Sequence, residues 1–323
     1  TLLLYPTPSR SFWIAGVVVS GYGKGASVVF SSGLLWSRVQ AVTDQALKSG
    51  SLQPIETDFQ FLEDAGTRFV VRIVSNLARK GQQSSHARRR GFNPFLPYDP
   101  QLYVADISET HVGVLNKFNV VDHHLLIVTR EFEHQQTRLN SDDFFALARA
   151  LVEYPSLGFY NSGKLAGASQ PHKHLQLIPL PLLDGTTEVA LSPFDDLSTE
   201  SEVCGPTRRL PFAHAAARMD SRIWQDPSQA AIALKDGYSR LLESLRIVAS
   251  EDRDTRIPSA YNLLVTRAWM LVVPRRQECF AGVSLNAMAF AGALLVRDAE
   301  QLDALQQSGP MAALQHAAGT EVE

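Results

Sequence analysis

Apolar residues recur at helical spacing in several parts of the chain and predict amphipathic helices there. In the first of these helices, Trp36, Val39 and Val42 fall on one face, and a Ser-Gly pair follows as a stop signal. The second has acidic residues in its first turn, and Ser141 or Asp142 is its expected N-cap. The predicted helices are residues 35–47, 141–152, 230–248 and 298–306.

Shorter segments rich in β-branched and apolar residues, bounded by turn residues, predict strands. They are residues 68–74, 102–107, 111–118, 124–129, 157–161, 175–179, 261–266 and 269–273. The turns between residues 102 and 129 are short, which favours antiparallel pairing, because parallel partners need a long crossover. Strands and helices mix without a regular βαβ cadence, so the predicted fold class is α+β.

Composition narrows the partners and the compartment. The net charge of −3 gives no reason to expect nucleic-acid or membrane-surface binding. Cys204 and Cys279 lack partners at zinc spacing, and a chain of 323 residues needs no disulfide scaffold. The apolar run at residues 12–20 is too short to span a bilayer and precedes no clear cleavage site. We therefore expect a cytoplasmic protein without nucleic-acid or membrane partners.

Residues 161–179 concentrate the candidate chemistry. His172, His174 and Gln176 alternate, and alternate side chains of a strand point to the same face, so the three are expected to form one polar row. Just upstream, a glycine-containing loop can bring backbone N–H groups to an anion. Lys164 and Ser169 add a charge and a hydroxyl to that loop.

This pattern suits covalent phosphoryl chemistry at His174. A neutral imidazole can attack an α-phosphate, expel a polyphosphate and hold a nucleotidyl group for a second acceptor. Lys164, the amide of Gln176 and backbone donors would stabilise the phosphate charge. The attacking nitrogen needs its lone pair, so the other ring nitrogen should donate to a carbonyl. Structural or metal-binding histidines are the alternative, since His-x-His pairs on strands also bind metals.

The row His172-x-His174-x-Gln176 resembles the motif of the histidine triad superfamily in its transferase form, whereas hydrolases of that superfamily usually carry a third histidine at the position of Gln176. Longer stretches resemble the diadenosine tetraphosphate phosphorylase (ATP adenylyltransferase) family. They are NPFLPYDPQLYV, LNKFNVVDHHLLIVTREFE, NSGKLAGASQPHKHLQLIPLP and YNLLVTRAWMLVVPRR. The resemblance runs from about Leu35 to the C-terminus and leaves residues 1–34 unsupported.

The resemblance implies a histidine-triad-like antiparallel sheet flanked by helices, with additional N- and C-terminal elements. It divides the chain into a catalytic core at residues 35–182, a flexible loop at 183–209 and a C-terminal region at 210–323 packed on the core. His174 would be the nucleotidylated residue.

Phosphate-binding roles are expected for several further residues. The resemblance implies them for Asn161, Gly163, Ser169 and Gln176. Asn116, Lys117 and Arg275 lie at predicted strand ends and are further candidates, with a solvated surface position as the alternative for the two cations. At most one of His123 and His124 can join a site, and the resemblance implies packing roles for both.

The expected reaction converts diadenosine tetraphosphate and inorganic phosphate into ATP and ADP. The alternatives are a dinucleoside-polyphosphate hydrolase, a hexose-1-phosphate uridylyltransferase and a non-catalytic nucleotide-binding protein. A divalent cation, expected to be Mg²⁺, should accompany the polyphosphate. The sequence contains no dedicated carboxylate cage for it and suggests no organic cofactor.

Overall fold

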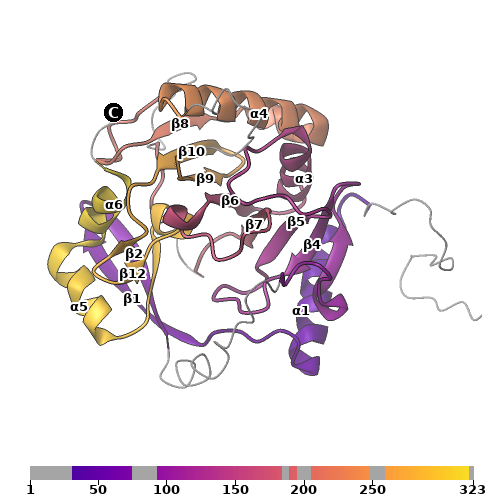
Figure 1. Cartoon of the computed structure of the whole chain (residues 1–323), viewed down its shortest axis with the longest axis horizontal. Coiled ribbons are helices and arrows are strands. Elements are labelled where there is room, and N and C mark those ends of the chain that lie inside the picture. The colour runs from indigo at the N-terminus through magenta and orange to yellow at the C-terminus, as the bar shows by residue number, and fades with distance from the viewer. Residues whose placement is uncertain (1–30, 75–92, 184–188, 195–204, 248–258, 320–323) are drawn as a thin grey trace, which may run out of the picture.

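An eight-stranded antiparallel sheet forms the centre of the molecule (Figure 1). The computed structural model describes residues 31–74, 93–183, 189–194, 205–247 and 259–319, so the expectations for residues 12–20 and for most of the 183–209 loop lie outside it. In spatial order the strands are β3 (Tyr103–Asp106), β4 (His111–Leu115), β5 (Leu125–Thr129), β7 (His174–Pro179), β6 (Ser156–Ser162), β9 (Tyr261–Val265), β10 (Trp269–Pro274) and β8 (Ala215–Arg218).

The sheet contains strands from both expected parts of the chain. Strands β3 to β7 come from the expected core, and β8 to β10 come from the region after residue 210. The seam between them is the antiparallel pair β6 and β9, in which Asn161 lies opposite Asn262. Every pair in this sheet is antiparallel, which confirms the α+β prediction and the antiparallel pairing expected for residues 102–129.

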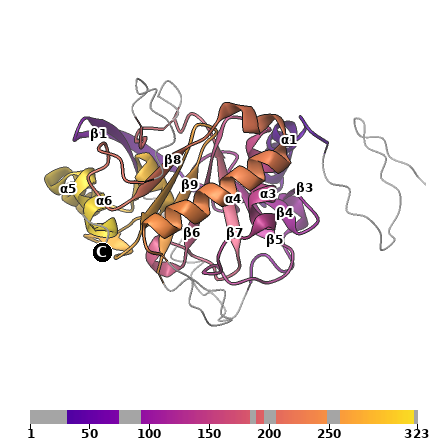
Figure 2. The same cartoon turned by 90° about the horizontal axis from the view of Figure 1, so that it is seen from above.

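Three helices cover one face of the sheet. They are α1 (Leu35–Ser49), α3 (Ser141–Leu151) and α4 (Pro227–Ser244), and Figure 2 shows α4 lying across the strands. Their apolar faces and the inward residues of the strands form one continuous core. The N-cap predicted for α3 is wrong, because Asn140 caps it and forms a capping box with Asp143.

The opposite face packs against a smaller layer. Its sheet contains β1 (Thr57–Asp64), β2 (Thr67–Val74) and β13 (Ala293–Val296), with β13 parallel to β2. Helices α5 (Ala299–Ser308) and α6 (Pro310–Ala318) and the short pair β11 (Cys279–Phe280) and β12 (Val283–Ser284) complete it. The sequence did not predict β1, β13 or α6, because β1 has no fully buried residue to give a clear apolar period and the other two are short.

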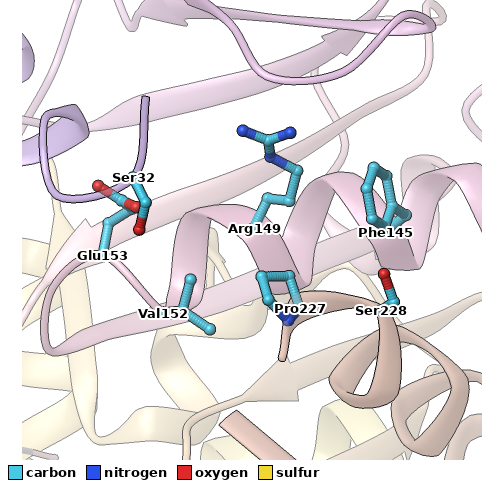
Figure 3. Close-up of a pocket in the computed structure, with 7 residues that line it drawn as sticks. All are labelled: Ser32, Phe145, Arg149, Val152, Glu153, Pro227 and Ser228. Carbon is cyan, nitrogen blue, oxygen red and sulfur yellow. The ribbon is translucent and has the colours of Figure 1, made fainter. Parts of the chain in front are cut away.

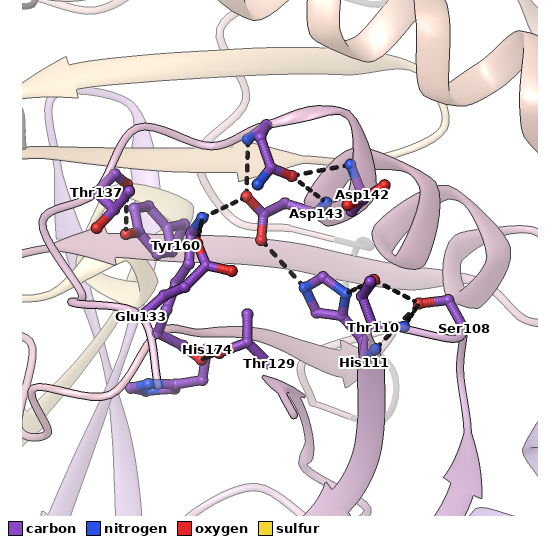
Figure 4. Close-up of polar contacts among 12 residues, drawn as sticks. Ser108, Thr110, His111, Thr129, Glu133, Thr137, Asp142, Asp143, Tyr160 and His174 are labelled. Atoms are coloured by element: carbon purple, nitrogen blue, oxygen red, sulfur yellow. Dashed lines mark hydrogen bonds and ion pairs between the residues drawn. The ribbon is translucent and has the colours of Figure 1, made fainter. Parts of the chain in front are cut away.

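A cluster of buried charges fastens the helical layer to the central sheet (Figure 4). Lys173 Nζ lies 2.6 Å from Asp143 Oδ2 and 2.8 Å from Glu133 Oε2, and the Lys173 and Asp143 side chains are 0% exposed. His111 Nε2 lies 3.1 Å from the other oxygen of Asp143. Burial raises the pKa of Asp143, but the His111 hydrogen bond and the Lys173 charge outweigh it and bring that pKa below its ordinary value.

The position of this cluster in the chain explains its value to the site. Lys173 immediately precedes His174 and extends toward the helical side, so the neighbouring histidines are held toward the other side. The Asp143 carboxylate also accepts a 2.7 Å bond from the amide of Asn140 and thereby couples the start of α3 to the strand.

We predict that Asp143→Ala lowers the free energy of unfolding by about 3–5 kcal/mol, because it leaves a buried ammonium ion short of a partner. Asp142→Ala is the matched control: Asp142 is exposed on the same turn, and its loss should cost about 1 kcal/mol or less. Urea unfolding of both variants measures the difference. Equal losses would show that the buried ion pair has no special weight.

Candidate active site

His172, His174 and Gln176 lie on the face of the central sheet turned away from α1, α3 and α4. In the register, His174 lies opposite Val128 and Gln176 opposite Leu126. Those two residues belong to a small apolar cluster with Phe95, Val112 and Val114. The expected polar row is therefore present, although β7 begins only at His174, and His172 precedes the strand in an isolated bridge with His134.

The ring of His174 is oriented by its own backbone neighbour. Its Nδ1 lies 2.8 Å from the carbonyl oxygen of His172, and a carbonyl only accepts, so Nδ1 carries the proton and Nε2 carries the lone pair. The expectation that this nitrogen donates to a carbonyl is confirmed. The residue is 4% exposed, and its ring centroid lies 5.2 Å from that of Phe95.

Burial is the main cause that lowers the pKa of His174, to about 4, and the neighbouring His172 adds to the effect while the carbonyl bond opposes it. At neutral pH the ring is uncharged. The geometry thus supplies an imidazole nitrogen that is both neutral and fixed in tautomer, which nucleophilic attack requires.

His172 supports this arrangement and uses both ring nitrogens to do so. Asn93 Oδ1 accepts from the amide of Phe95 at 3.0 Å, so Asn93 presents Nδ2 to His172 Nδ1, also at 3.0 Å. The Nε2–H of His172 then donates to the carbonyl oxygen of Thr129 at 2.9 Å. His172 therefore holds the carbonyl that orients His174.

The side chain of Gln135 bridges β6 and β7 at the position of His174. Its Oε1 accepts from the His174 amide at 2.8 Å, and its Nε2 donates to the carbonyl oxygens of Asn161 and His174 at 3.0 and 3.1 Å. It therefore takes the place of direct backbone bonds between the two strands. Sequence reasoning missed Gln135, because no local pattern marks a glutamine that inserts into a sheet.

Asn161 is 2% exposed and continues the β6 row that runs beside the β7 row. Its Oδ1 accepts from Asn262 Nδ2 at 2.8 Å and from the amide of Ala287 at 3.0 Å. The two asparagines are register partners across the seam of the sheet.

The loop after β6 requires glycine at Gly163. This residue has φ 84°, and a Cβ there would lie 2.8 Å from the Gln136 side chain. Lys164 opens a short 3₁₀ helix and is exposed, as is Ser169 farther along the loop. The phosphate-binding roles of these residues stay predictions.

Arg275 is buried, unlike the solvated strand-end cation that the sequence also allowed. It is 5% exposed, and its guanidinium donates to Asn262 Oδ1 at 2.7 Å and to the carbonyl oxygens of Leu285 and Gln277 at 2.8 and 2.7 Å. A phosphate contact through these N–H groups would break bonds in a buried setting, which is costly. The structure therefore gives Arg275 an internal role beside Asn161, and its expected contact with a distal phosphate stays a prediction.

His124 also differs from its expected packing role. Its Nε2 lies 2.9 Å from Gln176 Oε1, and its Nδ1 lies 3.3 Å from Asn116 Nδ2. The strand period could have found this residue, because His124, Leu126 and Val128 alternate toward the face that carries Gln176. Lys117 follows Asn116 at the end of β4 and is half-buried.

A hollow of about 240 Å³ lies away from this site, beside α3 and the start of α4 (Figure 3). Glu153 on its wall accepts from the amides of Gly33 and Leu35 and so neutralises the N-terminus of α1. Within the described part of the chain, no group of three or more His, Cys, Asp or Glu side chains is placed to hold a metal ion. Within the same part, no helix has the length and apolar character to cross a membrane.

Two family models match the sequence. The Ap4A phosphorylase N-terminal domain matches residues 25–196, and the ATP adenylyltransferase C-terminal domain matches residues 208–319. The first match alone covers more than half of the chain. The chain belongs to the Ap4A phosphorylase family. The family match begins ahead of Leu35, where the resemblance was expected to start.

Two proteins of Saccharomyces cerevisiae are similar to the chain. Diadenosine 5',5'''-P1,P4-tetraphosphate phosphorylase 2 is 27% identical over 291 residues, which cover 81% of this chain and 87% of that protein. Protein APA1 is 26% identical over 282 residues, covering 79% and 84%. The crystal structure of yeast Ap4A phosphorylase Apa2 matches with a TM-score of 0.72 at 23% identity, over 90% of this chain and 95% of that one. This structural likeness shows a shared fold.

For this Ap4A phosphorylase family member, the low pKa of His174 predicts activity that persists into acid. Protonation removes the Nε2 lone pair, so the rate of modification of His174 should fall only as the pH drops through about 4, well below the ordinary 6.5. Rapid-quench measurement of the rate at which His174 is modified, from pH 8 downward, tests this prediction. Circular dichroism confirms folding at each pH. A half-maximal rate near pH 6.5 in folded protein would contradict it.

Proposed function

We propose that the protein phosphorolyses diadenosine tetraphosphate (Ap4A) to ATP and ADP through an adenylyl-histidine intermediate at His174. The observation that carries the proposal is the neutral, tautomer-fixed ring of His174, which shares its row with Gln176 and lies on the strand next to Asn161. Family membership supports the same reaction, and the yeast relative Apa2 has been crystallised with AMP and with Ap4A.

The reaction has two displacements at one phosphorus atom. His174 Nε2 attacks an α-phosphorus of Ap4A, an N–P bond forms, and the P–O bond to the departing ATP breaks. An oxygen of inorganic phosphate then attacks the same phosphorus, the N–P bond breaks, and ADP leaves with His174 restored. The ring keeps its Nδ1 proton throughout, and the His172 carbonyl stabilises the positive charge that the adenylylated ring carries.

Amide N–H groups of Asn161 and Gln176 are the proposed donors to the transferred phosphate. Backbone amides of the glycine loop, the Ser169 hydroxyl and the Lys164 and Lys117 ammonium groups are the proposed contacts for the remaining phosphates. We propose that a divalent cation, Mg²⁺ by its preference for phosphate oxygens, enters bound to the polyphosphate.

Product analysis with and without phosphate tests the reaction class. With Ap4A and phosphate, we expect ATP and ADP in equal amounts. Without phosphate, a single-turnover amount of ATP should appear together with an acid-labile adenylyl label on His174. EDTA should slow both steps if the cation enters with the substrate.

Two variants complete this test. His174→Asn should abolish the label and the turnover, whereas His316→Gln, an exposed histidine on α6, should retain both. Formation of AMP and ATP regardless of phosphate would instead place the protein among the hydrolases.

Lys164 gives a separate prediction, because it is exposed on the loop after Gly163 and is proposed to bind a non-transferred phosphate. Loss of one such contact should cost about 2–4 kcal/mol of transition-state stabilisation, or roughly 30- to 1000-fold in kcat/KM. Lys164→Met removes the charge at similar volume, and Lys48→Met on α1 is the matched control. A Lys164→Met enzyme within about threefold of the wild type would put this lysine outside the site.

A further inference from the structure

Two side-chain amides flank His174, and an amide can present either of two opposite faces. Asn161 and Gln176 each carry one oxygen that accepts and one NH₂ group that donates. Phosphate oxygens only accept, so the site works with these amides in one orientation and is repelled by the other. What sets the orientation is therefore part of the chemistry.

For Gln176 the orientation can be traced back to a backbone amide. The N–H of Phe118 lies 3.3 Å from the Asn116 oxygen, and a backbone N–H can only donate, so Asn116 turns its Nδ2 toward His124. That group lies 3.3 Å from His124 Nδ1, which must accept. Withdrawal from water lowers the pKa of His124 to about 4, so the ring is neutral and its single proton is on Nε2.

The last link of this chain fixes the glutamine. His124 Nε2–H donates to Gln176 Oε1 at 2.9 Å, so the oxygen of Gln176 is occupied. Within the described residues, no hydrogen bond engages its Nε2. The NH₂ group of Gln176 is therefore the part of its amide that can bind a ligand.

For Asn161 the orientation starts from a guanidinium. Arg275 can only donate, so the atom 2.7 Å from its Nη1 is Asn262 Oδ1. Asn262 Nδ2 then donates to Asn161 Oδ1 at 2.8 Å, and the amide of Ala287 donates to the same oxygen at 3.0 Å. Asn161 is left with its NH₂ group, as Gln176 is.

We propose that Asn116–His124 and Arg275–Asn262 are two pairs of positioning residues that set the polarity of the Gln176 and Asn161 amides. In each pair, an obligatory donor, the Phe118 amide or the Arg275 guanidinium, fixes which way the next side chain turns. The last side chain of each pair therefore donates to the oxygen of one amide, and both amides present N–H groups to the transferred phosphate. This inference rests on the proposed function for the identity of the anion. It assigns a task to four residues that do not themselves touch the reacting atoms.

A purely structural role for these bonds predicts something different. In that case, losing His124 would lower stability and would add its effect to any other change in the site. If His124 acts through Gln176, its loss should cost nothing further once Gln176 has been removed, because coupled residues give non-additive effects.

The test is a double-mutant cycle with a rescue variant. His124→Phe keeps a ring and removes the donor, whereas His124→Gln places an amide donor near the position of Nε2. We expect His124→Phe to slow single-turnover adenylylation of His174 by roughly 10- to 100-fold and to weaken AMP binding, and His124→Gln to stay within roughly fivefold of the wild type.

The decisive comparison is made in the Gln176→Ala background. There, His124→Phe should cause less than a roughly twofold further change in rate and in AMP affinity. Additive losses in the double variant, or a His124→Phe rate equal to that of the wild type, would overturn the proposal. His123→Asn is the matched control, because His123 contacts Thr43 and Trp36 instead of the site.

Asn116→Asp keeps the experiment decisive if His124→Phe does not fold. The carboxylate still accepts from Phe118 but presents His124 Nδ1 with an acceptor in place of the donor. The neutral ring then carries its proton on Nδ1, so Nε2 accepts and the Gln176 amide is expected to turn its NH₂ group toward it. Its loss of rate should also vanish in the Gln176→Ala background, whereas simple charge repulsion would persist there and would count against the proposal.

The second pair is tested in the same way with Asn262→Asp, which keeps an acceptor for Arg275 and removes the donor to Asn161 and to the carbonyl oxygen of Ala166. We expect a loss of AMP affinity that disappears when Asn161→Ala is also present, and a loss that persists would overturn this half. AMP binding needs no turnover, so both cycles can still be measured if the wild type binds AMP but forms no adenylyl-enzyme. That result would refute the proposed function and leave this inference testable.

Discussion

The hydrogen bond from His174 Nδ1 to the carbonyl of His172 joins residues only two positions apart, yet side chains from distant parts of the chain hold both of its ends. The acceptor end is held by the His172 ring, which is bound on one side by Asn93 and on the other by Thr129. The donor end is held by Gln135, which binds the His174 backbone. Without these restraints the ring could turn or change tautomer, and the lone pair at Nε2 would not be reliably available.

Two incompatible environments meet one residue apart where β7 begins. Toward the helices, Lys173 is tied to Asp143 among buried charges; toward the other face, His174 is withdrawn from water and uncharged. A strand separates the two because successive side chains point in opposite directions. A buried charge is costly to desolvate, and the network of Asp143, Glu133 and His111 offsets that cost with directed bonds. This fixes the register of His174, since a slip of one residue would exchange the two faces.

The parts of this design that follow a local period could be predicted from the sequence. The alternation of His172, His174 and Gln176 predicted one polar row, and the apolar stripe of residues 35–47 predicted α1. The contribution of Asn262 and Arg275 could not be predicted, because it depends on β6 meeting β9 far along the chain. For the same reason the parallel pairing of β13 with β2 was invisible locally. The burial of Arg275 could not be predicted either, because a sequence gives a cation's charge but not its surroundings.

The seam between β6 and β9 has a consequence for how such chains can vary. It joins a strand from the part matched by one family model to a strand from the part matched by the other, and the Asn161–Asn262 bond crosses it. A chimera assembled from the N-terminal part of this protein and the C-terminal part of a distant relative would inherit only one side of that bond. We expect such a hybrid to be active only when the residue that replaces Asn262 also donates a hydrogen bond to Asn161. Compatibility at one amide pair, rather than overall identity, would then decide which halves can be recombined.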